Sequence, residues 1–453
     1  MNTSDPLHAA AQTVLTRCLG LPGGANLVVF ADETTQSIAQ LLVEQADALE
    51  MQPLLAYFGT KTQRRLATQP LSLGLQQALR EADAVLVCLS SAPATYEFRN
   101  AAREFAYSAR CKVGHMPGID EETLLLADVD YDELTRHCEL LAIALLRSSS
   151  LTIKTIDAAG GRHCLTVPLD PDTMPIISDG IIQKSSWGNI PSGETYIAPA
   201  PFRGQGSIVI NGSIRNYVMR AGEELVLHFH KGRLISWDPQ DSQVARHFMA
   251  EAVESAQAQN DPNWSQLGEV GLGVNPRVAQ LTGSMLLDEK KYGTAHIALG
   301  DNTDMGGQVR SSIHYDMVSL QPEVSVDGRI IMRDGRLVLG PEGLLPSLGD
   351  VHPPTDWTVD LPMRVTAVRG EPDEQGRLRR MWDTGSGRVC SVVVGDDETA
   401  RQAAELYTIL RRQPRPSPLG AIRDRLTTIP NDGALVAVAY LLSTCHLVKP
   451  EKP

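Results

Sequence analysis

The sequence predicts an α/β domain with an open sheet, then an α+β domain, and finally a small winged-helix-like module. Three observations support this division. Short apolar runs alternate with helix-like segments over residues 1–150, and period-two alternation predicts antiparallel strands over residues 151–340. A separate pattern of three short strands followed by three helices fills residues 361–453.

The first domain is predicted from apolar runs at Leu27–Phe30, Leu54–Tyr57 and Ala84–Val87, which are typical of buried parallel strands. Between them, Ser37–Leu49 and Leu71–Arg80 carry apolar residues at helical spacing. Strands that alternate with helices indicate a parallel sheet with right-handed crossovers. No G-x-G-x-x-G motif follows the first run, so a dinucleotide-binding fold is not supported.

The pattern of apolar residues changes at about residue 151. Leu151–Ile156 and Cys164–Val167 alternate on either side of a Gly-Gly turn, and further short strands continue to about residue 340. Residues 341–360 are rich in glycine and proline and predict a linker. The winged-helix-like module, residues 361–453, follows it.

Composition excludes several classes of protein. The chain has 453 residues and a formal charge of −13, which argues against a nucleic-acid groove. No apolar stretch reaches the ~20 residues of a membrane span, and no signal-like leader is expected. The seven cysteines are scattered without a C-x-x-C pair, as in reduced cytoplasmic proteins. We therefore expect a cytoplasmic protein without nucleic-acid or membrane partners.

Four glycine-punctuated segments of the second domain carry residues that bind metals. N-I-P-S-G-E ends at Glu194, and G-E-V-G-L-G places Glu269 among small residues. T-A-H-I-A-L-G contains His296, and H-Y-D-M-V contains His314 and Asp316, which share one face of a strand. Carboxylate and imidazole ligands suit Zn, Mn, Co or Fe, and the absence of cysteine ligands argues against a structural zinc site.

Taken together, these segments resemble the thermophilic metalloaminopeptidases of the AmpS/AmpT type. They occur in that family's order with similar spacing, and the resemblance covers about residues 25–340. It implies an N-terminal α/β domain before a catalytic domain, a homodimer, and two divalent ions (Zn, Mn or Co) per active site. It also implies a set of metal ligands: Glu194, Glu269, His296, His314 and Asp316, with Glu289 as a weaker candidate.

By the same resemblance, two ions would activate a hydroxide for attack on an amide carbonyl, and a nearby carboxylate would carry the proton. We assign catalytic roles to Glu194, Tyr292 and Thr303. Thr303 marks a departure, because the family has a catalytic-site tyrosine at this position. Tyr292 and Tyr315 are the tyrosines that we consider as its replacement.

A second branch with the same fold is the ring-cleaving dihydroxypyridine dioxygenase, which uses a single Fe(II). The segment D-N-T-D-M-G-G, residues 301–307, resembles this branch more than the peptidases. However, that branch has histidine at the position of Glu269 and lacks both Glu194 and His296. Because ligand type decides which metal chemistry is available, the ligand set favours a hydrolase.

The C-terminal module loosely resembles the PqqD-type peptide-recognition module of ribosomal-peptide natural-product pathways. Such modules bind a leader peptide by adding it as a strand to a sheet edge. We therefore expect a metal-dependent hydrolase that cleaves a peptide or amino-acid amide, with natural-product maturation as one setting. The alternatives are an Fe(II) dioxygenase and a non-catalytic peptide-binding protein.

Overall fold

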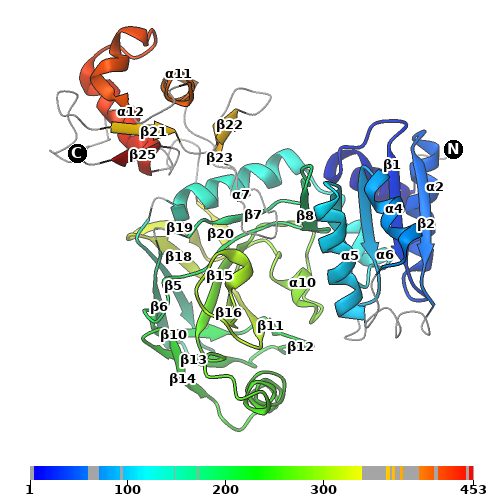
Figure 1. Ribbon diagram of the computed structural model, residues 1–453. Helices are drawn as coiled ribbons and strands as arrows, with labels where there is room; N and C mark the ends of the chain where they lie inside the picture. The colour runs from blue at the N-terminus through cyan, green and yellow to red at the C-terminus, as the bar shows by residue number, and fades with distance from the viewer. Residues whose placement is uncertain are drawn as a thin grey trace.

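The computed structural model describes residues 5–59, 71–91, 95–146, 148–170, 173–338, 364–367, 370–372, 378–380, 397–412, 417–444 and 448–451. Figure 1 shows the arrangement of its helices and strands. The predicted linker, residues 341–360, lies outside the described residues.

The first sheet is parallel, with strand order β2-β1-β3-β4-β8. Its strands are β1 (Asn26–Ala31), β2 (Gln52–Tyr57), β3 (Ala84–Cys88), β4 (Lys112–His115) and β8 (Ser186–Asn189). The helices of this part are α1 (Pro6–Thr13), α2 (Gln36–Ala48), α4 (Leu73–Glu81), α5 (Tyr96–Ser108), α6 (Glu121–Leu125) and α7 (Tyr131–Leu146), with a π-helical turn at Val14–Cys18.

Helices cover both faces of this sheet because its central strands are apolar on both sides. On β1, Leu27 and Val29 belong to the same core cluster as buried residues of α1 and α2. Val28 and Phe30 instead face the cluster that contains residues of α4 and α5. This three-layer arrangement is what near-continuous apolar runs predict.

The fifth strand comes from the second part of the chain. β8 begins at Ser186 and pairs in parallel with β4, so that Asn189 lies opposite His115. The chain therefore returns to the first sheet after the boundary that the sequence suggests at residue 150. β8 then leads directly into the strand that begins at Glu194.

Two antiparallel sheets form the second part. The larger has the order β14-β13-β10-β6-β5-β18-β19-β20. Its strands are β5 (Ser150–Ile156), β6 (Arg162–Pro168), β10 (Gln205–Ile210), β13 (Leu225–His230), β14 (Arg233–Asp238), β18 (Glu323–Val326), β19 (Arg329–Arg333) and β20 (Arg336–Leu337).

The other sheet has the order β12-β11-β17-β16-β15-β9-β7. Its strands are β7 (Ile176–Ser178), β9 (Glu194–Ile197), β11 (Ser213–Ile214), β12 (Tyr217–Val218), β15 (Leu267–Gly273), β16 (Thr294–Gly300) and β17 (His314–Leu320). The helical segments nearby are α8 (Gln243–Phe248), a π-helical turn (Met249–Glu254), α9 (Ser255–Ala258), α10 (Met285–Asp288) and a 3-10 turn (Thr303–Met305).

The two antiparallel sheets share one core. Ile153 and Ile208 of the larger sheet belong to the same buried cluster as Leu272 and Ile297 of the other. β10 contacts β17, and the Ser319 hydroxyl donates a hydrogen bond to the Val209 carbonyl at 2.7 Å. One face of the seven-stranded sheet is therefore used for packing, and the residues that alternate with the packed ones point away from this core.

The described C-terminal segments form a strand order β24-β21-β25 and a hairpin of β22 and β23. Their bounds are β21 (Arg364–Ala367), β22 (Gly370–Pro372), β23 (Leu378–Arg380), α11 (Asp397–Arg411), β24 (Ser417–Pro418), a 3-10 helix (Leu419–Arg425), α12 (Asp432–Thr444) and β25 (Val448–Glu451). Glu405 of α11 accepts hydrogen bonds from Thr427 and Thr428 at 2.6–2.9 Å, which tie α11 to the segment before α12.

The predicted mixed α/β architecture is confirmed. The winged-helix form stays a prediction, because the third predicted strand, residues 389–394, lies outside the described residues. The predicted second helix of the module is a 3-10 helix, and the final strand β25 was not expected. Within the described residues, no helix combines the length and apolar character that a membrane crossing requires.

Candidate metal centre

The candidate ligands lie on one face of the seven-stranded sheet, opposite the packed face. Glu194 of β9 lies beside Gly273 of β15, and Gly271 lies beside His296 of β16. Residues that face each other across paired strands project to the same side. His314 and Asp316 of β17 follow by the same register, opposite Gly300 and Ala298.

Glycines of β15 leave the space that these side chains occupy. A Cβ atom at Gly271 would lie 2.1 Å from Nε2 of His296. At Gly273 it would lie 2.5 Å from the carbonyl oxygen of Glu289. Both distances are shorter than any real Cβ contact, so the small residues around Glu269 are required by the close approach of its neighbours.

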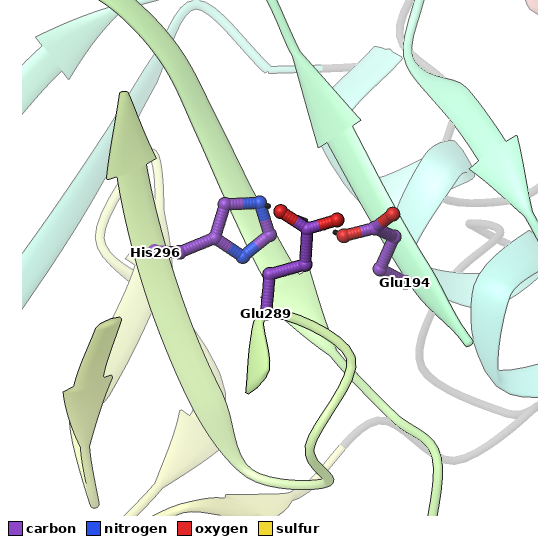
Figure 2. A group of neighbouring side chains, drawn as sticks. All are labelled: Glu194, Glu289 and His296. Carbon is purple, nitrogen blue, oxygen red and sulfur yellow. Dashed lines mark ion pairs between the residues drawn. The ribbon is translucent and has the colours of Figure 1, made fainter. Parts of the chain in front are cut away.

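Glu194, Glu289 and His296 form the first group of possible ligands. Figure 2 shows them converging from β9, from the end of α10 and from β16. One ligand atom of each lies within 4.8 Å of the other two. His296 is fully buried and Glu194 nearly so, which places this group at the floor of the site.

Glu269, His314 and Asp316 form the second group, with the same mutual spacing of ligand atoms. Nε2 of His314 lies 3.1 Å from Oδ1 of Asp316. Nδ1 of His314 lies 2.7 Å from the carbonyl oxygen of Asp301. A carbonyl can only accept, so Nδ1 carries a proton and Nε2 faces the carboxylates, an orientation typical of metal-binding histidines.

Glu269 joins the two groups. Its Oε1 lies 3.1 Å from Nε2 of His296, and its Oε2 lies 3.3 Å from Nε2 of His314. Burial raises the pKa of Glu269, but hydrogen bonds from both histidines outweigh it and lower the pKa below its ordinary value. Each oxygen of this ionised carboxylate therefore belongs to one group.

Lys290 is a part of this centre that the sequence analysis missed. Its side chain is fully buried, with Nζ 2.9 Å from Oε1 of Glu194 and 2.5 Å from Oε1 of Glu289. Burial, together with the charge of Glu194, raises the pKa of Glu289 to about 8. The D-E-K triplet beside an apolar strand was the only sequence pattern that could have indicated Lys290, but a lysine in such a triplet is usually solvated.

The carboxylates hold protons on both histidines. Burial lowers the pKa of His296, but the hydrogen bond to Glu269 and the nearby negative charges raise it to about 9. Burial also lowers the pKa of His314, but the negative charge of Asp316 outweighs burial and raises the pKa well above its ordinary value. Burial raises the pKa of Asp316, but the charge of His314 outweighs it and lowers the pKa to about 2.

The residues present fit divalent cations. Four carboxylates converge here with Lys290 as their buried ammonium partner, and once the two histidines release their protons to act as ligands, the negative charge that remains requires cations to balance it. Within the described part of the chain, Oε2 of Glu194 is buried and accepts no hydrogen bond. Oxygen and nitrogen donors in two adjoining groups suit two ions better than one.

Both groups open into a cavity of about 580 Å³. Its walls come from α5, from β8 and from the ligand-bearing strands and loops. The lining residues are Asn100, Arg103, Glu104, Asn189, Glu194, Tyr196, Glu269, Glu289, Asp301, Asp304, Met305, Ser311, Ser312, Ile313, His314 and Asp316. The α/β part of the chain therefore contributes one wall of the site.

Three residues considered for the catalytic tyrosine function do not line this cavity. The Tyr292 hydroxyl accepts a hydrogen bond from the Leu337 amide at 3.3 Å. Thr303 is exposed and donates to Asp301. Tyr315 is fully buried on the opposite face of β17, as strand alternation requires of a residue between His314 and Asp316.

Residues 165–338 match the model of a family described as thermophilic metalloprotease (M29). This match supports the resemblance to the metalloaminopeptidases that the sequence predicts, whereas no comparison tests the PqqD-like reading of residues 361–453. All six side chains of the two groups lie within this segment. No curated protein matches the chain significantly.

Two solved structures are similar to this chain at 18% identity. One is 2,5-dihydroxypyridine dioxygenase from Pseudomonas putida, with a TM-score of 0.57; the match covers 74% of this chain and 98% of that one. The other is wild-type AmpT from Thermus thermophilus, with a TM-score of 0.52; the match covers 74% of this chain and 99% of that one. At this identity the likeness establishes a shared fold.

Lys290→Met should destabilise the metal-free protein by about 3 kcal/mol, because it leaves two buried carboxylates without their cation. Urea unfolding after chelation measures the change. Lys154→Met is the matched control, since Lys154 makes a 2.8 Å ion pair with Glu323 in solvent and should change stability little. Equal effects of the two substitutions would contradict the importance of the buried ion pair.

Metal affinity should rise with pH. Below about pH 9 a proton on His296 competes with a metal ion, so raising the pH from 6.5 to 8.5 removes a competitor. We expect the apparent affinity for Mn²⁺ to increase at least about tenfold per pH unit, as measured by calorimetry. His296→Gln should reduce this slope by about one proton. A pH-independent affinity would show that the histidines are not ligands.

Proposed function

We propose that this chain is a divalent-metal hydrolase of the aminopeptidase type, which cleaves the amide bond of a peptide or an amino-acid amide. The observation that supports it best is Glu269, whose two oxygens face one histidine each. A carboxylate shared by two groups of ligands is an arrangement suited to a two-ion site.

The six residues of the two groups would hold two ions, which would be Zn²⁺, Mn²⁺ or Co²⁺. When bound, such ions polarise an amide carbonyl and lower the pKa of bound water. Lys290 holds Glu194 and Glu289 in place through Oε1 of each carboxylate, which leaves the two Oε2 atoms as the possible metal ligands. The cavity itself has a volume suited to a small ligand.

Asp304 is our candidate for the group that carries a proton in place of the missing tyrosine. It lines the cavity beside the second group, and it is not among the six ligands. Desolvation by the surrounding protein raises the pKa of Asp304 above the ordinary value for aspartate and outweighs the lowering effect of His314, although the residue itself is exposed. A carboxyl group in this position can act as a general acid or base.

The second candidate function is an Fe(II) dioxygenase. It is favoured by the fold shared with the dihydroxypyridine dioxygenase and by the likeness of residues 301–307 to that branch. A single Fe(II) would need only one group of ligands. The other group, which also has two carboxylates and a histidine, would then have no role.

We further propose, on the sequence alone, that the chain acts as a homodimer in the cytoplasm. On the same basis, the C-terminal module would bind a leader peptide in natural-product maturation. Removal of residues 361–453 should therefore lower the affinity for a leader-like peptide. An unchanged affinity would contradict this role of the module.

Metal content should separate the candidates. After loading, we expect two Zn, Mn or Co ions per chain by mass spectrometry, together with hydrolysis of leucine p-nitroanilide. Glu269→Gln should lower turnover by on the order of 100-fold or more and reduce the bound metal. Glu254→Gln, an exposed substitution in the same part of the chain, is the control. One Fe(II) per chain would indicate the dioxygenase, and absence of metal a binding protein.

Asp304→Asn should lower kcat about 100-fold while two ions remain bound, because the amide cannot exchange the proton. Metal analysis and steady-state kinetics on the same preparation test this. Asp241→Asn is the control, since Asp241 is exposed and pairs with Arg246 on the surface. An unchanged kcat would remove Asp304 from the proposed chemistry.

A further inference from the structure

Part of the cavity wall comes from the first sheet and its helices and differs in charge from the rest. It is built by Asn100, Arg103 and Glu104 of α5 and by Asn189 of β8. Among the described residues that line the cavity, Arg103 is the only lysine or arginine, whereas seven lining residues are acidic: Glu104, Glu194, Glu269, Glu289, Asp301, Asp304 and Asp316.

Arg103 is held in a defined orientation by β8. The carbon of its guanidinium group lies 4.1 Å from the centre of the Trp187 ring. A guanidinium group placed over an aromatic ring can still donate hydrogen bonds from the N–H groups at its edge. An arginine oriented in this way can bind a carboxylate through two parallel hydrogen bonds.

Asn189 adds donors on the same wall. Nη1 of Arg99 lies 3.2 Å from Nε2 of His115, and a guanidinium group can only donate, so Nε2 accepts. The proton of a neutral His115 is then on Nδ1, which donates to Oδ1 of Asn189 at 3.0 Å. This relay fixes the Asn189 amide with its oxygen turned to His115, so its NH₂ group is the part that a ligand meets.

From these contacts we propose that Arg103 and Asn189 bind a carboxylate group of the substrate, at the end opposite the bond that is cleaved. The inference rests on the proposed hydrolase function for the position of that bond. Among the described lining residues that the two proposed ions would not bind, Arg103 is the only lysine or arginine, so it marks the place where an anionic group of the substrate is most stable. The carboxylate is either the free C-terminus of a short peptide or an acidic side chain.

The test measures binding rather than turnover. Three reduced-amide analogues, which cannot be hydrolysed, are titrated by calorimetry into the metal-loaded full chain: leucyl-leucine, its carboxamide, and the carboxamide of leucyl-glutamate. We expect at least one of the two carboxylate-bearing analogues to bind about 10- to 100-fold more tightly than the leucyl-leucine carboxamide. Tighter binding of the leucyl-leucine acid would identify the bound carboxylate as a peptide C-terminus. Tighter binding of the glutamate analogue would identify it as an acidic side chain.

Arg103→Met should abolish this preference, and Asn189→Leu should reduce it. Arg103→Lys keeps the charge without the paired hydrogen bonds and should show an intermediate preference. This variant still tests the proposal if Arg103→Met does not fold. Arg246→Met, on the surface, should keep the full preference. Equal binding of all three analogues to the wild type, or a full preference in folded Arg103→Met, would overturn the proposal.

Hydrolysis of leucinamide by the wild type is measured in parallel, because this substrate has no carboxylate. Absence of that reaction would count against the hydrolase function. The binding comparison would still decide whether the wall of α5 and β8 selects a carboxylate.

Discussion

The site depends on one interaction, the contact of a single buried carboxylate with two histidines from different strands. Glu269 lies 3.1 Å from His296 and 3.3 Å from His314, and each contact uses a different oxygen. This geometry requires β15, β16 and β17 to keep an exact register, since a shift by one residue would turn the ligands into the core. It also requires Gly271, because a side chain there would occupy the position of the His296 ring.

Charge balance explains why the centre can exist before any ion binds. Lys290 neutralises part of the negative charge, and the raised pKa values of His296 and Glu289 show that protons neutralise more of it. A metal ion would take over this role by displacing protons from the same groups. The protein is therefore prepared for cations by the same buried charges that would otherwise oppose its folding.

Much of the site could be predicted from local pattern, and the rest depends on tertiary structure. The two-residue spacing of His314 and Asp316 correctly indicated a shared strand face, whereas the close approach that requires glycines beside Glu269 is visible only in the structure. Lys290 was missed because a charged triplet carries no sign of burial. Arg103 and Asn189 could not be found, because α5 and β8 reach the cavity only through the return of the chain to the first sheet.

That return limits how far apart the two walls of the cavity can lie. Asn189, at the end of β8, and Glu194, at the start of β9, are separated by four residues, so their Cα atoms are at most about 18 Å apart. The two walls of the cavity are thus the two ends of one short tether, and they cannot move apart as independent domains would. The distance between Asn189 and the first group of possible ligands therefore cannot exceed the length of this short segment.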